Sequence, residues 1–233
     1  MWEETIYEVL RGPLVSASAA VCLLGIVFQI IRFWRRSRQI AEFCYQSDTR
    51  PTPGIAVPRG AQLPPLKLVD LRKTVFARYP VMVVVTALFH AGLVIAPVFL
   101  LSHNVLLDQS WGFSLPCFSE RLTDYLTLLV LGACLFFLAR RVLLARVRAM
   151  SSFYDFLILG LVTMPFLTGY LAYHQFFDYR TLIMLHMGSG ELLIMALPFT
   201  KLMHAVYFFI NRILVGGEHS FNKKGKRVWL PCR

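Results

Sequence analysis

The sequence predicts an all-α fold, a single membrane domain over residues 1–233 built as a bundle of five transmembrane helices. Its composition favours this fold, because 57% of the residues are apolar and only 16% are charged, whereas soluble domains carry about 25% charged residues. The apolar residues also gather in stretches close to the ~20 residues that a helix needs to cross a bilayer. We expect spans at about 13–34, 79–102, 122–139, 153–174 and 182–210.

The basic residues predict how this bundle is oriented. The chain has 24 Lys and Arg residues and a net charge of +11. Most of them lie in 32–78, 140–148 and 212–233, while Arg11, Arg121 and Arg180 are the ones left for the other side of the membrane. Since cytoplasmic loops of membrane proteins collect Lys and Arg, we expect a periplasmic N-terminus and a cytoplasmic C-terminus. The positive charge is then a topology signal, and we expect no nucleic-acid partner.

The N-terminus and the cysteines exclude several other interpretations. The opening residues MWEETIYEVLRG are acidic and lack the basic region of a cleaved signal peptide, so we expect the first span to be retained as a helix. The five cysteines form no C-x-x-C and no C-x-x-C-H motif. This pattern argues against an iron–sulfur cluster or a covalently bound c-type haem in this chain.

Two histidines in the last span, His186 and His204, are eighteen residues apart. We expect 182–210 to be one helix, and at ~100° per residue this spacing makes five whole turns, so both imidazoles leave the same face. Histidines in a membrane helix need partners inside the bundle. Haem iron is a partner that two imidazoles on facing helices can share.

The second span and its outer end supply the matching residues, His90 and His103. Because this span runs outward and the last one inward, His90 lies at the depth of His204, and His103 at the depth of His186. Thirteen residues leave the two imidazoles ~140° short of a common face on a straight helix. We expect a kink or a change in winding at Pro97 to restore the alignment.

These matched depths predict two b-type haems, an inner one on His90 and His204 and an outer one on His103 and His186. Two imidazoles close the iron to other ligands, which suits electron transfer rather than oxygen chemistry. His174, at the end of the fourth span, is a second candidate for the outer level or else an interfacial histidine in an aromatic belt.

Four further residues near these histidines are candidates for the same site. Glu191 is either part of a proton path and quinone site or a structural hydrogen-bond partner. Gly188 and Gly190 would let a flat macrocycle approach the backbone. Lys201 either reaches toward the membrane surface or contacts a haem propionate.

The polar segment 37–78 contains five prolines between Pro51 and Pro65, which forbid a continuous helix. It is either a cytoplasmic linker or a docking surface for a soluble partner. Its Arg72, Lys73 and Arg78 are either interfacial anchors or partners of haem propionates.

The segments ALFHAGL, SHNVLL, GSGE and PFTKLMH, all between Arg72 and Arg212, resemble the membrane cytochrome b family typified by the gamma subunit of respiratory nitrate reductase. The form of these motifs is closest to the variants in transmembrane redox complexes of sulfate-reducing bacteria, the high-molecular-weight cytochrome c complex and its relatives. The chain departs from the nitrate-reductase pattern in the second span, where the histidines of that family are closer together.

The resemblance implies a subunit of the bacterial inner membrane in which His90, His103, His186 and His204 ligate two haems b. It also implies electron exchange between menaquinone, or a periplasmic multihaem cytochrome c, and a cytoplasmic iron–sulfur subunit. Other membrane subunits are further implied partners. Two other classes of protein remain open: a haem-poor membrane anchor or assembly subunit, and a small transporter that uses Glu191 and the histidines as a proton relay. The absence of an internal repeat disfavours the transporter.

Overall fold

The structure, a computed structural model, describes residues 2–47 and 79–218. These residues form helices joined by short loops, with no strand among them, and five of their helices are long and apolar enough to cross a membrane. The prediction of an all-α, multi-pass membrane protein is confirmed. The five membrane-length segments are Glu4–Arg36, Pro80–Phe99, Glu120–Leu143, Phe153–Tyr173 and Tyr179–Phe199.

The chain divides into two units, each described here by itself. The first unit consists of Met1–Arg11 and Pro65–Gly190, and the second of Gly12–Pro64 and Glu191–Arg233. The boundary at Gly190 falls inside a helix, so the last span contributes to both units. The prediction of a single membrane domain stays a prediction.

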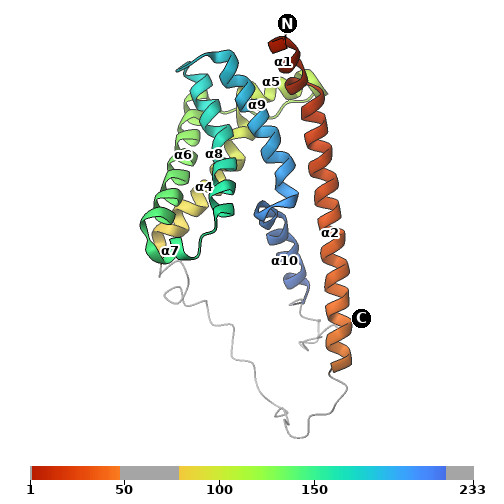
Figure 1. The fold of residues 1–233 in the computed structure, drawn as a ribbon. Helices are drawn as coiled ribbons and strands as arrows, with labels where there is room; N and C mark the ends of the chain where they lie inside the picture. The colour runs from red at the N-terminus through yellow and green to blue at the C-terminus, as the bar shows by residue number, and fades with distance from the viewer. Residues whose placement is uncertain (1, 48–78, 219–233) are drawn as a thin grey trace. The chain divides into compact units, whose positions relative to one another are not determined.

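The first unit is a layer of membrane-length helices in which α6 packs against both α4 and α8 (Figure 1). The contact between α4 and α6 is close because Gly92 has no side chain: a Cβ there would lie 2.7 Å from Cγ2 of Val130, which is fully buried. Its elements are α1 (Trp2–Arg11), α4 (Pro80–Phe99), α5 (Leu101–Trp111), α6 (Glu120–Leu143), α7 (Ala145–Ala149), α8 (Phe153–Tyr173) and the first part of α9 (Tyr179–Ala196).

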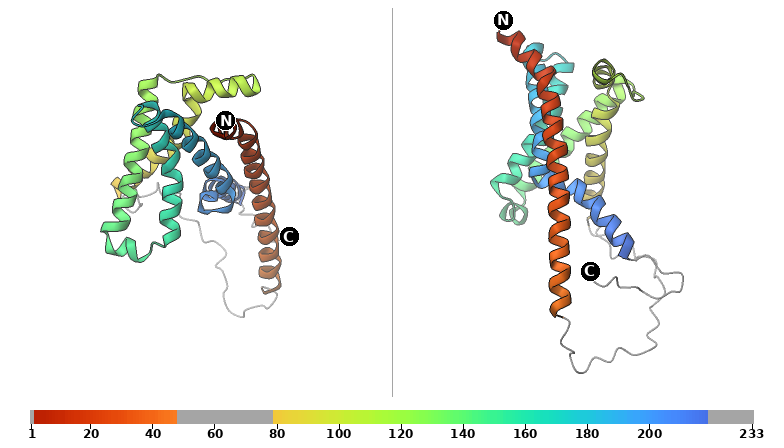
Figure 2. Two further views of the ribbon diagram at one scale, coloured as in Figure 1. Left: turned by 45° about the horizontal axis from the view of Figure 1, so that its top comes forward. Right: turned by 90° about the vertical axis from the view of Figure 1, so that its right-hand side faces the viewer.

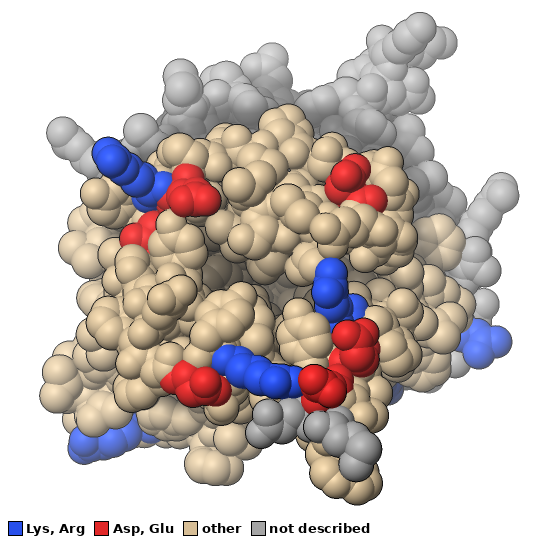
Figure 3. Space-filling model, turned by 90° about the horizontal axis from the view of Figure 1, so that it is seen from above, with Lys and Arg blue, Asp and Glu red and all other residues tan. Residues whose placement is uncertain are grey.

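The two ends of the α6–α8 pair differ in charge. Arg140 and Arg141 end α6, and α7 adds Arg146 and Arg148. At the opposite end, Glu120 opens α6. Figure 3 shows this opposite end, where acidic and basic side chains lie interspersed among uncharged ones.

The second unit contains α2 (Pro13–Ser47), the end of α9, the short 3₁₀ turns η2 (Leu197–Phe199) and η3 (Lys201–Met203), and α10 (His204–Glu218). Helix α2 continues well past the predicted span 13–34, so the first part of the predicted linker 37–78 is helical. Residues 48–78 of that linker, with Arg72, Lys73 and Arg78, lie outside the described residues.

The prediction of one uninterrupted helix over 182–210 is wrong. Helix α9 ends at Ala196, and α10 begins at His204. Pro198 explains the interruption, since its ring lacks an N–H and clashes with the preceding turn. Thr200 is extended, with φ −118° and ψ −178°, and its side-chain oxygen accepts a hydrogen bond from the N–H of Leu202 at 3.3 Å. The eighteen-residue spacing therefore does not place His186 and His204 on one helix face.

Candidate haem-ligand site

His103 lies on α5, beyond a break that separates it from the helix of His90. Helix α4 ends at Phe99, Leu100 is extended with ψ 130°, and α5 begins at Leu101. Figure 2 shows α5 turning away from the direction of α4. The predicted distortion near Pro97 therefore takes the form of a full break three residues later, and the angular mismatch of a straight helix does not apply.

Three carbonyl groups just before this break, those of Pro97, Val98 and Phe99, have hydrogen-bond donors from outside helix α4. The Nδ1–H of His103 donates to the Pro97 oxygen at 2.8 Å, and the N–H of Phe118 donates to the Phe99 oxygen at 3.0 Å. The Asn104 amide donates to the Val98 oxygen at 2.8 Å, and also at 3.0 Å to the Leu100 oxygen, which accepts the backbone N–H of Asn104 at 3.1 Å as well. The break costs little because side chains replace the lost backbone bonds.

Asn104 also connects this break to the loop that follows α5. Its side chain is almost fully buried, with 1% of its surface exposed. Its Oδ1 accepts a hydrogen bond from the N–H of Leu115 at 2.8 Å. All the polar atoms of the Asn104 amide are thus used in holding the segment that carries His103.

His186 lies on α9 and is held against α8. Its Nδ1–H donates to the Pro165 oxygen at 2.8 Å. One turn further along α8, Gly169 faces the imidazole so closely that a Cβ would lie 2.9 Å from both Cε1 and Nδ1 of the ring. His186 is half-buried in this position.

Asp178 fixes the start of α9, upstream of His186. Its Oδ2 accepts a hydrogen bond from the N–H of Thr181 at 2.8 Å, which caps the first turn of the helix. Hydrogen bonds from the side chain and backbone of Thr181 hold the pKa of the Asp178 carboxyl below its usual value. The group is ionised and acts as a cap at neutral pH.

The structure brings His103 and His186 together in the first unit. Their ring centres are 5.9 Å apart, and the ring planes differ by 18°. Two metal–imidazole bonds of about 2 Å, with about 1 Å from each nitrogen to its ring centre, give a separation of about 6 Å for two imidazoles on opposite sides of one metal ion. The spacing fits shared axial ligation.

Both rings also have the nitrogen that such ligation requires. Each Nδ1 donates to a backbone carbonyl, which leaves the lone pair on Nε2. Among residues 2–47 and 79–218, neither Nε2 has a hydrogen-bond partner. The same described residues contain no group of three or more His, Cys, Asp or Glu side chains able to hold a metal ion, and a pair of imidazoles is the set that a b-type haem needs.

His90 and His204 belong to different units, so each is described alone. The Nδ1–H of His90 donates to the Thr86 oxygen at 2.7 Å, and the Nδ1–H of His204 donates to the Lys201 oxygen at 2.7 Å. Both imidazoles therefore hold the same tautomer as His103 and His186. Their pairing as ligands of an inner haem stays a prediction.

His174, the second candidate for the outer level, has a different environment. Its Nε2 lies 3.0 Å from Oδ1 of Asp124, so the nitrogen that a haem would need is engaged by a carboxylate. The rings of Tyr170, Tyr173 and Phe176 surround it, with centres 4.3, 5.1 and 5.9 Å away. This arrangement is typical of an interfacial histidine in an aromatic belt.

Glu191 is the buried acidic residue of the last span. Only 4% of its surface is exposed, and neither carboxylate oxygen has a hydrogen-bond partner among the described residues. Gly190 faces open space, since a Cβ there would meet nothing within 4 Å, and at Gly188 a Cβ would meet only the Leu10 side chain, at 3.7 Å. Lys201 is exposed on η3. The structural alternative for Glu191, a hydrogen bond to a histidine or to a neighbouring helix, is not found in the described residues.

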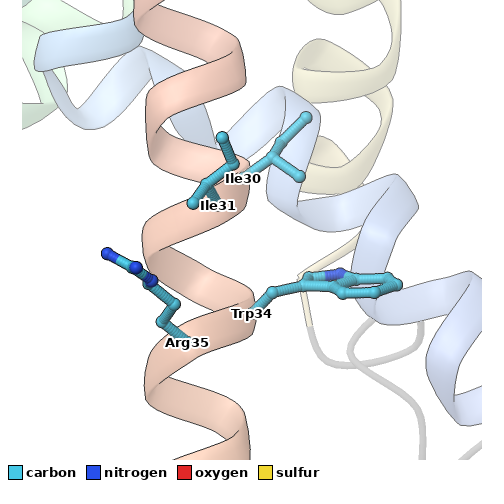
Figure 4. A pocket seen from close by; sticks show the side chains of 4 residues that line it. All are labelled: Ile30, Ile31, Trp34 and Arg35. Atoms are coloured by element: carbon cyan, nitrogen blue, oxygen red, sulfur yellow. The ribbon is translucent and has the colours of Figure 1, made fainter.

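An open, apolar hollow lies along α2 in the second unit. It is lined by Ile30, Ile31, Trp34 and Arg35 (Figure 4). Trp and Arg at the end of an apolar stretch are typical of the membrane–water interface. None of the predicted site residues lines the hollow.

A comparison with known proteins gives one informative match. A protein of Nitratidesulfovibrio vulgaris Hildenborough is 34% identical over 227 residues, which cover 94% of this chain and 96% of that protein. This chain belongs to its family. The relative carries no functional name, so the match shows common ancestry over the aligned residues. No family model matches the chain, and no solved structure matches it.

Sequence reasoning missed Asn104, Pro165 and Gly169 as members of this site. The signal for Asn104 is an amide that directly follows a histidine just beyond the end of a membrane span. The signal for the other two is their spacing of four residues, which places a proline carbonyl and a missing side chain on one face of a helix.

Proposed function

We propose that this protein is the dihaem b-type cytochrome subunit of a membrane-bound respiratory redox complex. The observation that carries the proposal is the His103–His186 pair. Two half-buried imidazoles lie 5.9 Å apart inside a membrane unit, and each holds its Nδ1–H on a backbone carbonyl. Backbone carbonyls are the usual partners of the second ring nitrogen in metal-ligating histidines.

The residues of this chain would bind and orient the two cofactors. When bound, haem b supplies reversible one-electron transfer. His103 and His186 would hold the outer group, and His90 with His204 the inner one. The carbonyls of Pro97, Pro165, Thr86 and Lys201 keep the four imidazoles in the Nε2-ligating tautomer and raise their basicity.

The charge distribution in the first unit supports the proposed orientation. The end of α6 and the short α7 carry four arginines, whereas the first turn of α6 carries one, Arg121, beside Glu120. Since Lys and Arg accumulate on the cytoplasmic side, the end of α6 faces the cytoplasm and its beginning faces the periplasm. His103 and His186 are then the outer pair, in the inner membrane of a bacterium.

The proposed partners follow from the family resemblance and from this orientation. On the periplasmic side the subunit exchanges electrons with menaquinone or a multihaem cytochrome c. On the cytoplasmic side it exchanges electrons with an iron–sulfur subunit, and other membrane subunits complete the complex. Glu191 is buried and has no hydrogen-bond partner among the described residues. Because an unpaired carboxylate in a membrane span is energetically costly and is usually functional, Glu191 is the proposed proton acceptor of the quinone site.

The test is a pyridine haemochrome assay with a redox titration on the purified subunit. We expect two haems b per chain. His103→Ala or His186→Ala removes the outer haem, and His90→Ala or His204→Ala removes the inner one. His174→Ala is the matched control and retains both. A wild-type protein without a Soret band would refute the proposal and favour the haem-poor anchor.

A further inference from the structure

Helix α8 contributes no predicted axial ligand, yet it makes the closest contacts to His186. Pro165 and Gly169 lie one turn apart on it, so they share a face. The Pro165 oxygen receives the Nδ1–H of His186 at 2.8 Å, and the missing side chain of Gly169 leaves the space that the ring fills. We propose that Pro165 and Gly169 are positioning residues that set the place and the basicity of the outer axial ligand His186, a proposal that rests on the proposed function.

The contact at Gly169 is too close for any other residue. A Cβ would lie 2.9 Å from two atoms of the His186 ring, Cε1 and Nδ1, which is closer than real Cβ atoms approach other heavy atoms. The ring cannot retreat without cost, because one side of it is hydrogen-bonded to Pro165 and the ring of His103 is 5.9 Å away. Alanine at position 169 must therefore lengthen the hydrogen bond or displace the ring from its partner.

Thr168 offers a second way to test how Pro165 positions His186. Its hydroxyl donates to the Met164 oxygen at 2.7 Å and also lies 3.3 Å from the Pro165 oxygen. The Pro165 carbonyl is thus shared between Thr168 and His186. Thr168→Val keeps the side-chain volume and removes the competing donor, so the bond from His186 becomes stronger and the imidazole more basic.

The experiment compares purified wild-type protein with Gly169→Ala, Thr168→Val and Gly160→Ala. Gly160 lies on the same helix, and a Cβ there meets nothing within 4 Å, so Gly160→Ala is the matched control. We expect Gly169→Ala to bind the outer haem about 10- to 100-fold more weakly and to change its electron paramagnetic resonance signal and potential. Thr168→Val lowers the outer potential at full occupancy. The inner haem is unchanged in every variant.

The outcomes separate this proposal from the proposed function. One outcome is a wild type with two haems and a Gly169→Ala variant whose outer haem has unchanged affinity, resonance signal and potential. That outcome overturns the positioning role of Pro165 and Gly169 but not the proposed function. If Gly169→Ala does not accumulate, an unchanged outer potential in Thr168→Val overturns it. Wild type with no haem overturns both proposals.

A different observation supports a second positioning role, for α2 in the second unit. A Cβ at Gly25 would lie 2.6 Å from Cγ of Pro198, and Nε2 of Gln29, one turn along, donates to the Pro198 oxygen at 2.9 Å. These contacts hold η2, the turn at which the last span breaks. His204 follows that break and donates its Nδ1–H to Lys201. We infer that Gly25 and Gln29 position the inner ligand His204 through this broken segment.

This inference also rests on the proposed function, and its test uses Gln29→Leu and Gly25→Ala. Both are expected to weaken binding of the inner haem or to shift its potential, while the outer haem stays as in wild type. Gly132→Ala, at a position on α6 where a Cβ meets nothing within 4 Å, is the control. Two haems in wild type and an unaltered inner haem in both variants overturn the inference alone. If Gly25→Ala does not fold, Gln29→Leu decides, because it removes one hydrogen bond and leaves the glycine contact intact.

Discussion

Asn104 allows the sharpest prediction about stability, because its amide holds the break that precedes α5. Asn104→Ala removes three hydrogen bonds, those to the oxygens of Val98 and Leu100 and that from the N–H of Leu115. The Leu100 oxygen keeps the backbone N–H of residue 104 as a donor at 3.1 Å. Two groups then lose these partners, the oxygen of the half-buried Val98 and the N–H of Leu115, a residue that is 40% exposed.

An unpaired buried group costs about 1–3 kcal/mol, and only the Val98 oxygen lies on a partly buried residue, so Asn104→Ala should lower the free energy of unfolding by about 1–3 kcal/mol. Asn104→Asp retains the acceptor for Leu115 and loses the donors, so it separates the two contributions. The assay is denaturation in detergent, followed by circular dichroism and by the absorbance of the outer haem. Ser110→Ala, at an exposed position of the same helix, is the control. If Asn104→Ala lowers the free energy of unfolding by less than about 1 kcal/mol, the stabilising role assigned to these hydrogen bonds is refuted.

Three further predictions test the cap, the acid and the packing. Because the pKa of the Asp178 carboxyl is lowered in the folded protein, its contribution to stability is complete above the ordinary carboxyl pKa and is lost as the pH falls through the lowered pKa. Asp178→Ala should therefore abolish this acid dependence of the melting temperature. Glu191→Gln should keep both haem spectra and slow their reduction by a menaquinol analogue about 100-fold; an unchanged rate contradicts its role as proton acceptor. Gly92→Ala, which would press on Val130, should lower the free energy of unfolding by about 1–3 kcal/mol, whereas Gly132→Ala, where a Cβ meets nothing within 4 Å, should not lower it.

Apolar length and composition were enough to predict the five spans, because bilayer thickness sets the length of a helix whatever its neighbours. The same information did not predict the course of the last span. Pro198 lies in an apolar run that reads as one helix, and proline is tolerated inside membrane helices wherever neighbours satisfy the freed groups. In α4 and α8 the helix continues through Pro97 and Pro165, whereas at Pro198 it breaks.

Helical periodicity was therefore a poor guide to which histidines share a face. The pairing of His103 with His186 was predicted from their depth in the membrane, which a break in the helix leaves nearly unchanged. A straight helix would turn His103 ~140° away from the face of His90. The break at Leu100 separates the two helices that carry these histidines, so that angle does not apply. Asn104 and Gly169 could not be found in this way, because their roles depend on contacts between segments far apart in the sequence.

The hydrogen bonds of the ring nitrogens separate the histidines more clearly than their positions do. His90, His103, His186 and His204 each donate Nδ1–H to a backbone carbonyl at 2.7–2.8 Å, so each keeps its lone pair on Nε2. His174 instead engages Nε2 with the carboxylate of Asp124. A carboxylate competes with iron for that nitrogen, whereas a carbonyl on the other nitrogen makes the imidazole a better ligand. His103 and His186 thus share one hydrogen-bonding pattern, whereas His174, the second candidate for the outer level, has its Nε2 engaged by Asp124.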